Sequence, residues 1–362
     1  PVSGIRFNLT SLQTRGTIAK ALKRNYLDTS ATWIDWDILI SDVCLRVLKL
    51  YRNGTSAEEI WPSETVILPQ FLIKPILPLH QPAIIFGDGG AGKGHIAIML
   101  SILAQLPYVD NPLGLIASDQ STNVLYLDYE SDRDEFERTL SGLCKGMGQS
   151  VGIKRLQMAH KLSGAIEQIK KRVVEDSIGL LVVDSLAPAS GGNIAEAEPA
   201  IELYTALRTL PSVTTLIIAH NSKDLEKRKS VYGSVFFTNL ARSVWEVKKS
   251  QEEGSTEMLI SMSHRKANRK LELPIGLSFQ FNEEENIISI SKTNLAGTSL
   301  SNQLPNSVRV LELLREGPRA AQSIAEILDI TVAVATTTLN RLKDKGNITH
   351  LPDKTWGLQA RR

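Results

Sequence analysis

The sequence predicts an α/β fold in which a mostly parallel β-sheet is flanked by helices. Apolar runs rich in β-branched residues alternate with helical stretches along the middle of the chain; these runs are AIIFG (83–87), TNVLYLDYE (122–130), IGLLVVDSL (178–186) and VTTLIIAHN (213–221). Strands that are apolar throughout belong to sheets that are covered on both faces. The first run also leads through a glycine-rich loop into a helical pattern, a sequence order typical of a phosphate-binding site.

Length and composition limit the classes of protein. The 362 residues are enough for two or three domains, and the 42% hydrophobic and 22% charged content is that of a globular protein. No apolar run reaches the length of a membrane span, and the first residues lack the order of a signal peptide. Cys44 and Cys144 fit neither a disulfide framework nor a zinc site. We therefore expect a cytoplasmic protein without a membrane partner.

Three regions follow one another along the chain. Residues 1–70 contain two stretches with helical periodicity, RGTIAKALKR and WDILISDVCLRVLKLYRNG, and are predicted to form a helical accessory segment. A proline-rich passage leads into the α/β domain, assigned to residues 71–297. Beyond residue 243 this domain changes to SVWEVKK, EMLISMS and LSFQFNEEENIISI, which predicts antiparallel strands that extend one edge of the sheet. Residues 298–362 form a polar linker and a last small domain.

The glycine-rich loop fits the pattern G-x-x-x-x-G-K-[ST] except at its last position. Its backbone N–H groups and the start of the next helix are suited to hold phosphates of ATP, and the nucleotide-binding residues are predicted to be Gly87, Asp88, Gly89, Gly90, Ala91, Gly92, Lys93, Gly94 and His95. We expect Lys93 to contact the β and γ phosphates. Gly94 replaces the hydroxyl that normally binds Mg²⁺, and a water can fill that position. Nucleotide binding should survive this change, with slower hydrolysis.

Two carboxylates follow predicted strands at the same edge of the sheet as the loop. Asp184 ends one buried run and has the position of the acid on the metal side, whereas Glu130 ends another and is preceded by Asp128. Strand-end carboxylates also cap turns, which is the plainer interpretation of each. Because parallel sheets bind ligands at the carboxyl ends of their strands, we expect both acids to take part in Mg²⁺ and ATP chemistry.

The order of motifs resembles a known family. GDGGAGKG, VLYLDYESDRDEFERTL, LLVVDSLAPASGG, LIIAHNSKD and YGSVFFTNLARSVWEV are similar to motifs of the RecA-like ATPases of the hexameric plasmid replicative helicase (RepA-type) group and their phage relatives. The resemblance covers roughly residues 75–292. It implies a RecA-like, ring-forming ATPase core in which Glu130 is the catalytic carboxylate and Asp184 binds Mg²⁺.

The resemblance also assigns roles to polar residues outside the loop. His220 would be the sensor that couples the γ-phosphate to a DNA-facing loop. Arg242 would be the finger that reaches the nucleotide of a neighbouring subunit, with Lys266 as a second candidate. Arg138 is a candidate for stacking on adenine. The plainer interpretations are a capped strand end for His220, a solvated or paired helix residue for Arg242 and a charged turn for Lys266.

Two loops are candidates for contact with single-stranded DNA. One is APASGGNIAEAE after Asp184, and the other is NSKDLEKRKSVYGS after His220, whose basic residues are Lys223, Lys227, Arg228 and Lys229. Such a loop can track phosphates inside a ring. It also holds Asp224 and Glu226, so a mobile charged surface loop is the alternative.

The last 55 or so residues have the pattern of three helices followed by a hairpin, which predicts a winged helix-turn-helix. In the third helix Ala335, Leu339 and Leu342 should pack inward, and Thr331 can cap its start. The outer face would then contact duplex DNA through Thr336, Thr337, Asn340 and Arg341, with Lys354 on the wing. Many winged helices dock proteins instead.

Together these features favour an ATP hydrolase that acts as a DNA-dependent motor, helicase-like, in DNA replication of a mobile element or phage. It would be a homo-oligomer, expected to be a hexameric ring, with single-stranded DNA as partner. One alternative is a RecA-family recombination mediator. The other alternative rests on Gly94, which lacks the usual Mg²⁺-binding hydroxyl. In this alternative the protein is an ATP-gated DNA-binding adaptor that hydrolyses little ATP.

Overall fold

The computed structural model describes residues 8–25, 33–53, 57–66, 68–106, 111–222, 230–268 and 270–359. The chain divides into two units, Pro1–Leu68 and Pro69–Arg362. The sequence placed this boundary after residue 70. Among the described helices, none is both long and apolar enough to span a lipid bilayer.

The first unit contains the two helices that the sequence predicts, α1 (Leu12–Asn25) and α2 (Trp36–Asn53). Ala19 on α1 and Cys44 on α2 are buried where the helices meet. Much of the apolar surface of α2 stays exposed, as at Ile38, Leu50 and Tyr51.

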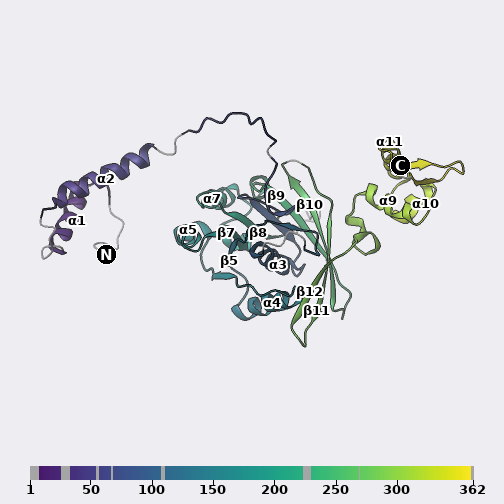
Figure 1. Ribbon diagram of the computed structural model, residues 1–362, viewed down its shortest axis with the longest axis horizontal. Coiled ribbons are helices and arrows are strands. Elements are labelled where there is room, and N and C mark those ends of the chain that lie inside the picture. Colours follow the sequence, from purple (N-terminus) through teal and green to yellow (C-terminus); the bar gives the residue numbers. More distant parts are fainter. Residues whose placement is uncertain are drawn as a thin grey trace. The chain divides into compact units, whose positions relative to one another are not determined.

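The second unit is built on a nine-stranded sheet with helices on both faces (Figure 1). The strand order is β12-β11-β10-β9-β3-β8-β7-β5-β6. Its parallel strands are β3 (Pro82–Gly87), β5 (Asn123–Asp128), β6 (Lys154–Gln157), β7 (Ile178–Asp184), β8 (Thr214–His220) and β9 (Ser243–Ser250). The antiparallel extension consists of β10 (Glu257–Ala267), β11 (Ile275–Asn282) and β12 (Ile287–Lys292). The mixed α/β class with a mostly parallel sheet is confirmed.

Two hydrophobic cores lie on opposite faces of this sheet. Alternate residues of β3 show the division, because Ile85 belongs to the core shared with α3 (Lys93–Gln105) and α4 (Arg133–Gly146). Its neighbour Ile84 belongs to the core under α5 (Ile166–Glu175), α6 (Leu186–Ser190), α7 (Ala197–Arg208) and α8 (Val235–Leu240). Strands covered on both faces explain the uniformly apolar runs.

Two details differ from the sequence-based expectation. The strand over 243–250 was expected to belong to the antiparallel extension, but β9 pairs in parallel with β3 and only its other edge pairs antiparallel, with β10. The proline-rich passage also forms strands, β1 (Phe71–Lys74) and β2 (Leu77–Pro78), which join β4 (Ile116–Ala117) in a small sheet. Prolines cannot donate to a strand ladder, so the pattern of this passage did not predict strands.

The end of the chain contains the predicted three helices and hairpin. These are α9 (Asn306–Arg315), α10 (Ala321–Leu328), α11 (Val332–Asp344), β13 (Ile348–His350) and β14 (Trp356–Leu358). They share a core of their own to which Ala335, Leu339 and Leu342 contribute, as predicted. Thr331 caps α11 by accepting a hydrogen bond from the Val334 N–H at 3.3 Å.

Replacing Leu339 with Ala should loosen this small core. Leu339 is fully buried, and a leucine-to-alanine change in a core costs about 2–5 kcal/mol. We expect faster amide hydrogen exchange over residues 306–358 and unchanged exchange in β3, β7 and β8. Asn340→Ala is the exposed control on the same helix. If Leu339→Ala speeds exchange equally across the central sheet, the core of the last three helices is not independent of the cores on the two faces of the sheet.

Candidate nucleotide-binding site

The glycine-rich loop connects β3 to α3 in a close backbone approach. A Cβ at Gly87 would lie 2.4 Å from the carbonyl oxygen of Val247 on β9, a distance that no side chain tolerates. Gly92 has a φ of 82° and caps α3, and a Cβ there would meet Ile260 Cδ1 at 2.8 Å. The loop therefore needs glycine at both positions. Its backbone N–H groups and the start of α3 share the cavity described below.

Lys93 is the first residue of α3 and turns back over the loop. Its ammonium group donates to the carbonyl oxygens of Gly87 at 3.0 Å and Asp88 at 2.7 Å. Burial lowers the pKa of Lys93, and the nearby carboxylates of Asp184 and Glu130 oppose that shift. A cation held beside the backbone N–H groups of a glycine-rich loop suits an anion with several phosphates.

Asp184 ends β7 and is almost fully buried. Burial raises its pKa to about 6, although the hydrogen bond from Tyr126 acts in the opposite direction. The Tyr126 hydroxyl donates to Asp184 Oδ2 at 2.6 Å from the neighbouring strand β5. This carboxylate faces the cavity, where a cation would favour its charged form.

Glu130 lies just beyond β5, in a turn that Asp128 fixes. Asp128 accepts hydrogen bonds from the backbone N–H groups of Glu130 at 3.0 Å and Ser131 at 2.9 Å, and it pairs with Arg155 at 2.8 Å. The Ser185 hydroxyl donates to Glu130 Oε1. His220 Nε2 lies 3.6 Å from the same oxygen. Glu130 is thus positioned from three sides.

These side chains surround one cavity of about 760 Å³. From the loop and the strand ends, the residues that the sequence predicted in its lining are Gly90, Ala91, Gly92, Lys93, Gly94, His95, Glu130, Asp184 and His220. The opposite wall comes from β9, β10 and β11 and includes Lys249, Met258 and Phe281. The His95 ring, whose pKa is lowered by burial, stands edge-on to Phe281 with ring centroids 5.5 Å apart. The cavity therefore has a charged end and an aromatic end.

The donor set fits Mg²⁺ bound together with phosphates. Mg²⁺ is usually held by one or two carboxylates, waters and substrate phosphates, and Asp184 and Glu130 line the same cavity. Within the described part of the chain, no group of three or more His, Cys, Asp or Glu residues is arranged to hold a metal alone.

Six residues predicted to contact a nucleotide lie outside this lining; they are Gly87, Asp88 and Gly89 of the loop, and Arg138, Lys266 and Arg242 elsewhere in the chain. Arg138 pairs with Glu135 on the exposed surface of α4. Lys266 donates to the carbonyl oxygens of Thr238, Asn239 and Ala241, and so caps the end of α8.

Arg242 lies at the amino end of β9, where its N–H donates to Pro82 O at 2.8 Å. Among the described residues, no hydrogen bond or ion pair involves its guanidinium group. The amino end of β9, where Arg242 lies, is five residues of the neighbouring strand β3 away from the phosphate loop. At roughly 3.3 Å per residue, this stretch is about 16 Å long. Arg242 therefore does not reach the nucleotide cavity of its own chain.

The predicted DNA contacts fall into two groups. Lys223, Lys227, Arg228 and Lys229 lie outside the described residues. Thr336, Thr337, Asn340, Arg341 and Lys354 are exposed, as expected from the helix pattern. The Thr337 hydroxyl, however, donates to its own helix at Ala333 O, 2.8 Å away.

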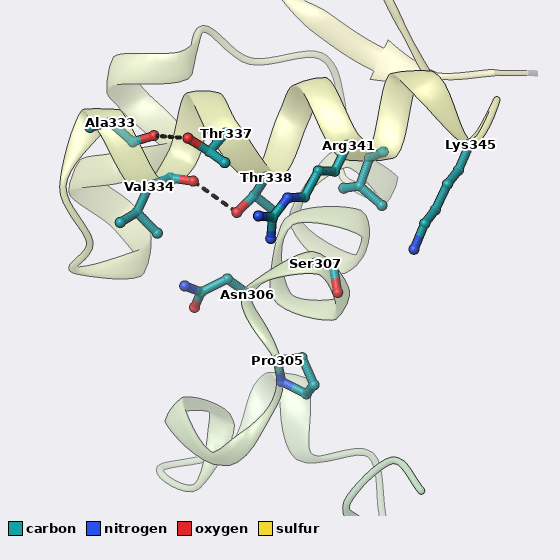
Figure 2. A pocket seen from close by; sticks show the side chains of 10 residues that line it. Pro305, Asn306, Ser307, Ala333, Val334, Thr337, Thr338, Arg341 and Lys345 are labelled. Carbon is teal, nitrogen blue, oxygen red and sulfur yellow. Dashed lines mark hydrogen bonds between the residues drawn. The ribbon is translucent and has the colours of Figure 1, made fainter. Parts of the chain in front are cut away.

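A second hollow, of about 550 Å³, lies between the outer face of α11 and the start of α9. Figure 2 shows Arg341 reaching from α11 toward the beginning of α9, with Lys345 just beyond the end of α11. The Thr338 hydroxyl bonds to Val334 O at 2.8 Å. Two basic side chains, those of Arg341 and Lys345, thus line the same hollow as the start of α9.

The segment that leaves the sheet runs beside the phosphate loop. Ser299, Leu300, Asn302 and Gln303 line a small cavity with Asp88, Gly89 and Ala91 of the loop and with Lys248 and Lys249 of β9. Leu300 is buried, and the Ser299 hydroxyl donates to Ser250 Oγ at 2.6 Å. The start of the linker is therefore packed against the site.

Comparison with known proteins agrees with this geometry. Residues 68–226 match the family described as an AAA domain, and this span holds the loop, Glu130, Asp184 and His220. The match and the site together support a P-loop ATPase domain.

Among solved structures, the chain is similar to a KaiC-like protein of the hyperthermophilic archaeon Pyrococcus horikoshii. The two sequences are 17% identical, the match covers 60% of this chain and 93% of that chain, and the TM-score is 0.40. No curated protein matches the chain significantly in sequence.

Sequence reasoning missed several residues of the site. Tyr126 had a signal, because it lies two residues before Asp128 in the same strand and the two side chains therefore point to the same face. Ser185 follows Asp184 directly and could also have been found. No sequence signal pointed to Lys249 and Phe281, since these residues line the cavity only because strands β9, β10 and β11 pair beside the loop.

Asp184→Asn should stabilise the ligand-free ATPase domain above pH 6. A carboxyl whose pKa is raised from 3.8 to about 6 carries a penalty in the folded state at every pH above that value, at most about 3 kcal/mol. The penalty shrinks as the pH falls from 6 toward 4. Thermal unfolding in EDTA should show a gain for Asp184→Asn at pH 8 that is smaller at pH 5. Asp119→Asn, an exposed carboxylate, is the control, and an equal gain at both pH values would contradict the assignment.

Proposed function

We propose that the protein is a DNA-dependent ATPase motor of a ring-forming, helicase-like kind that acts in DNA replication of a mobile element or phage. The observation that carries the proposal is the meeting of Lys93, Glu130, Asp184 and His220 around one cavity at the carboxyl edge of the sheet. Backbone N–H donors, a lysine and two carboxylates are the groups that phosphoryl transfer to water requires.

Each residue has a distinct task in this proposal. Lys93 and the loop N–H groups would hold the phosphates, and Asp184 together with the phosphates would hold Mg²⁺, whose charge would stabilise the transferred group. Glu130 orients the attacking water and accepts its proton. The hydrogen bond from Ser185 and the turn built on Asp128 fix Glu130 in place.

His220 is suited to link this chemistry to DNA. It lies 3.6 Å from Glu130 and immediately precedes the loop with the predicted basic residues. The ends of that loop are joined by backbone hydrogen bonds from Ser222 to Ser230 at 3.2 Å and from Tyr232 to His220 at 2.8 Å. A shift of His220 on hydrolysis would therefore be passed to both ends of the loop.

A ring explains the position of Arg242. Its guanidinium group lies at the opposite edge of the sheet from its own loop, so it contacts a nucleotide only if that nucleotide belongs to another copy of the chain. Lys266, close to Arg242, is engaged by three carbonyl groups and is better suited to support Arg242 than to replace it.

The last three helices and the hairpin are proposed to form a winged helix that binds duplex DNA. Thr336, Asn340 and Arg341 are exposed on α11, and Lys354 is exposed in the turn between β13 and β14. A short helix with exposed polar side chains that follows a helix-turn segment suits the major groove.

Gly94 favours one alternative, an ATP-gated DNA-binding adaptor that turns over little. Without the hydroxyl at this position, the cavity offers fewer direct ligands to Mg²⁺. A recombination mediator of the RecA family would share the whole cavity and differ in assembly, forming filaments in place of rings.

Turnover of ATP with and without single-stranded DNA separates these functions. We expect DNA to stimulate turnover, Lys93→Ala to lower it about a hundredfold or more, and Gly94→Ser to preserve or raise it, because a Cβ at Gly94 meets only Asp184 Oδ2, at 3.9 Å. Gly92→Ala, which meets Ile260 at 2.8 Å, is the damaging control. Turnover that no nucleic acid stimulates would exclude the motor, and binding of ATP without turnover would favour the adaptor.

Mixing two inactive variants tests the role of Arg242. Arg242→Ala should lower turnover about a thousandfold or more while leaving ATP binding within about threefold of the unmodified protein, because the residue serves a neighbour's site. Lys93→Ala subunits retain Arg242, so a mixture of the two variants should regain part of the activity. Absence of recovery in mixed oligomers of confirmed composition would refute action between subunits.

A further inference from the structure

Tyr126 makes a contact that the proposed chemistry does not otherwise use. It is fully buried in β5 and packs edge-on against Phe136, with ring centroids 4.9 Å apart. Its hydroxyl donates to Asp184 Oδ2 at 2.6 Å. Tyr126 is not part of the cavity lining, so it acts on Asp184 from behind and does not touch the nucleotide.

A side chain at Gly94, if there were one, would face the same oxygen, Asp184 Oδ2. A Cβ built at Gly94 lies 3.9 Å from Asp184 Oδ2 and meets no other atom within 4 Å. A serine hydroxyl carried by that Cβ would lie within hydrogen-bond reach of Oδ2. In the usual loop, the Ser or Thr at this position stands beside the metal. Here the oxygen that it would face is already held by a tyrosine.

We propose that Tyr126 is a positioning residue that replaces the absent hydroxyl of Gly94 by fixing Asp184 for Mg²⁺ from the neighbouring strand. The inference rests on the proposed nucleotide function. A buried carboxylate held by one oxygen keeps a single orientation, and the phenol supplies that restraint without entering the cavity. Its ring is immobilised by Phe136, so the hydrogen bond does not depend on a flexible loop.

A purely structural role is the competing explanation, because a buried hydroxyl needs a partner in any protein. Tyr204 provides the matched case. It is equally buried, and its hydroxyl donates to the carbonyl oxygen of Phe237 at 2.9 Å on the other face of the sheet. Loss of that hydroxyl removes a buried hydrogen bond without touching Asp184.

The test measures the affinity of AMP-PNP, a non-hydrolysable ATP analogue, by calorimetry in Mg²⁺ and in EDTA. Tyr126→Phe should lower the affinity gained from Mg²⁺ about tenfold, because a hydrogen bond to a charged group is lost, and leave the affinity in EDTA unchanged. Gly94→Ser combined with Tyr126→Phe should restore the Mg²⁺ gain to within about threefold of the unmodified protein. Tyr204→Phe should not change it.

Each contrary result has a definite meaning. An unchanged Mg²⁺ gain in Tyr126→Phe, an equal loss in EDTA, or no recovery on adding Gly94→Ser would overturn the positioning role while the proposed function stands. An unmodified protein that does not bind AMP-PNP in Mg²⁺ would instead overturn the proposed function, and this inference with it.

Discussion

The register of four parallel strands places the polar residues at their carboxyl ends side by side. Gly87 of β3 pairs with His220 of β8, Asp184 of β7 pairs with Ile218 of β8, and Asp128 of β5 pairs with Asp184. Because side chains alternate along a strand, a slip of one residue in any pair would turn one of these groups into a hydrophobic core. The apolar runs that precede the polar residues prevent such a slip, since both faces of the sheet are buried. The strand register therefore determines both the packing of the cores and the geometry of the site.

This origin explains how much the sequence could predict. Asp184 and His220 end apolar runs, and Lys93 and Glu130 come a few residues after such runs, so local pattern was enough to place these four residues at one edge. Whether Arg138 faces the cavity depends on the rotation of α4, which a helical pattern does not determine, and the structure turns it toward Glu135.

Non-local pairing was harder to predict. The apolar pattern of β9 does not reveal whether its neighbours run parallel or antiparallel, because a strand between two partners has the same pattern in either case. The wall of Lys249, Met258 and Phe281 depends on three strands folding back over the loop. In the last helices, by contrast, contacts are local, and the buried face of α11 was predicted correctly.

The path of the linker has a mechanical consequence. Leu300 and Ser299 are fixed to the sheet beside the phosphate loop, and α9 begins only a few residues later, at Asn306. The linker to the last helices is thus anchored at the edge of the sheet that carries the phosphate loop. A force that pulls on the last three helices would be transmitted through the linker to its neighbours Gly89 and Lys249. Such a force and a bound nucleotide would therefore act on the same part of the loop.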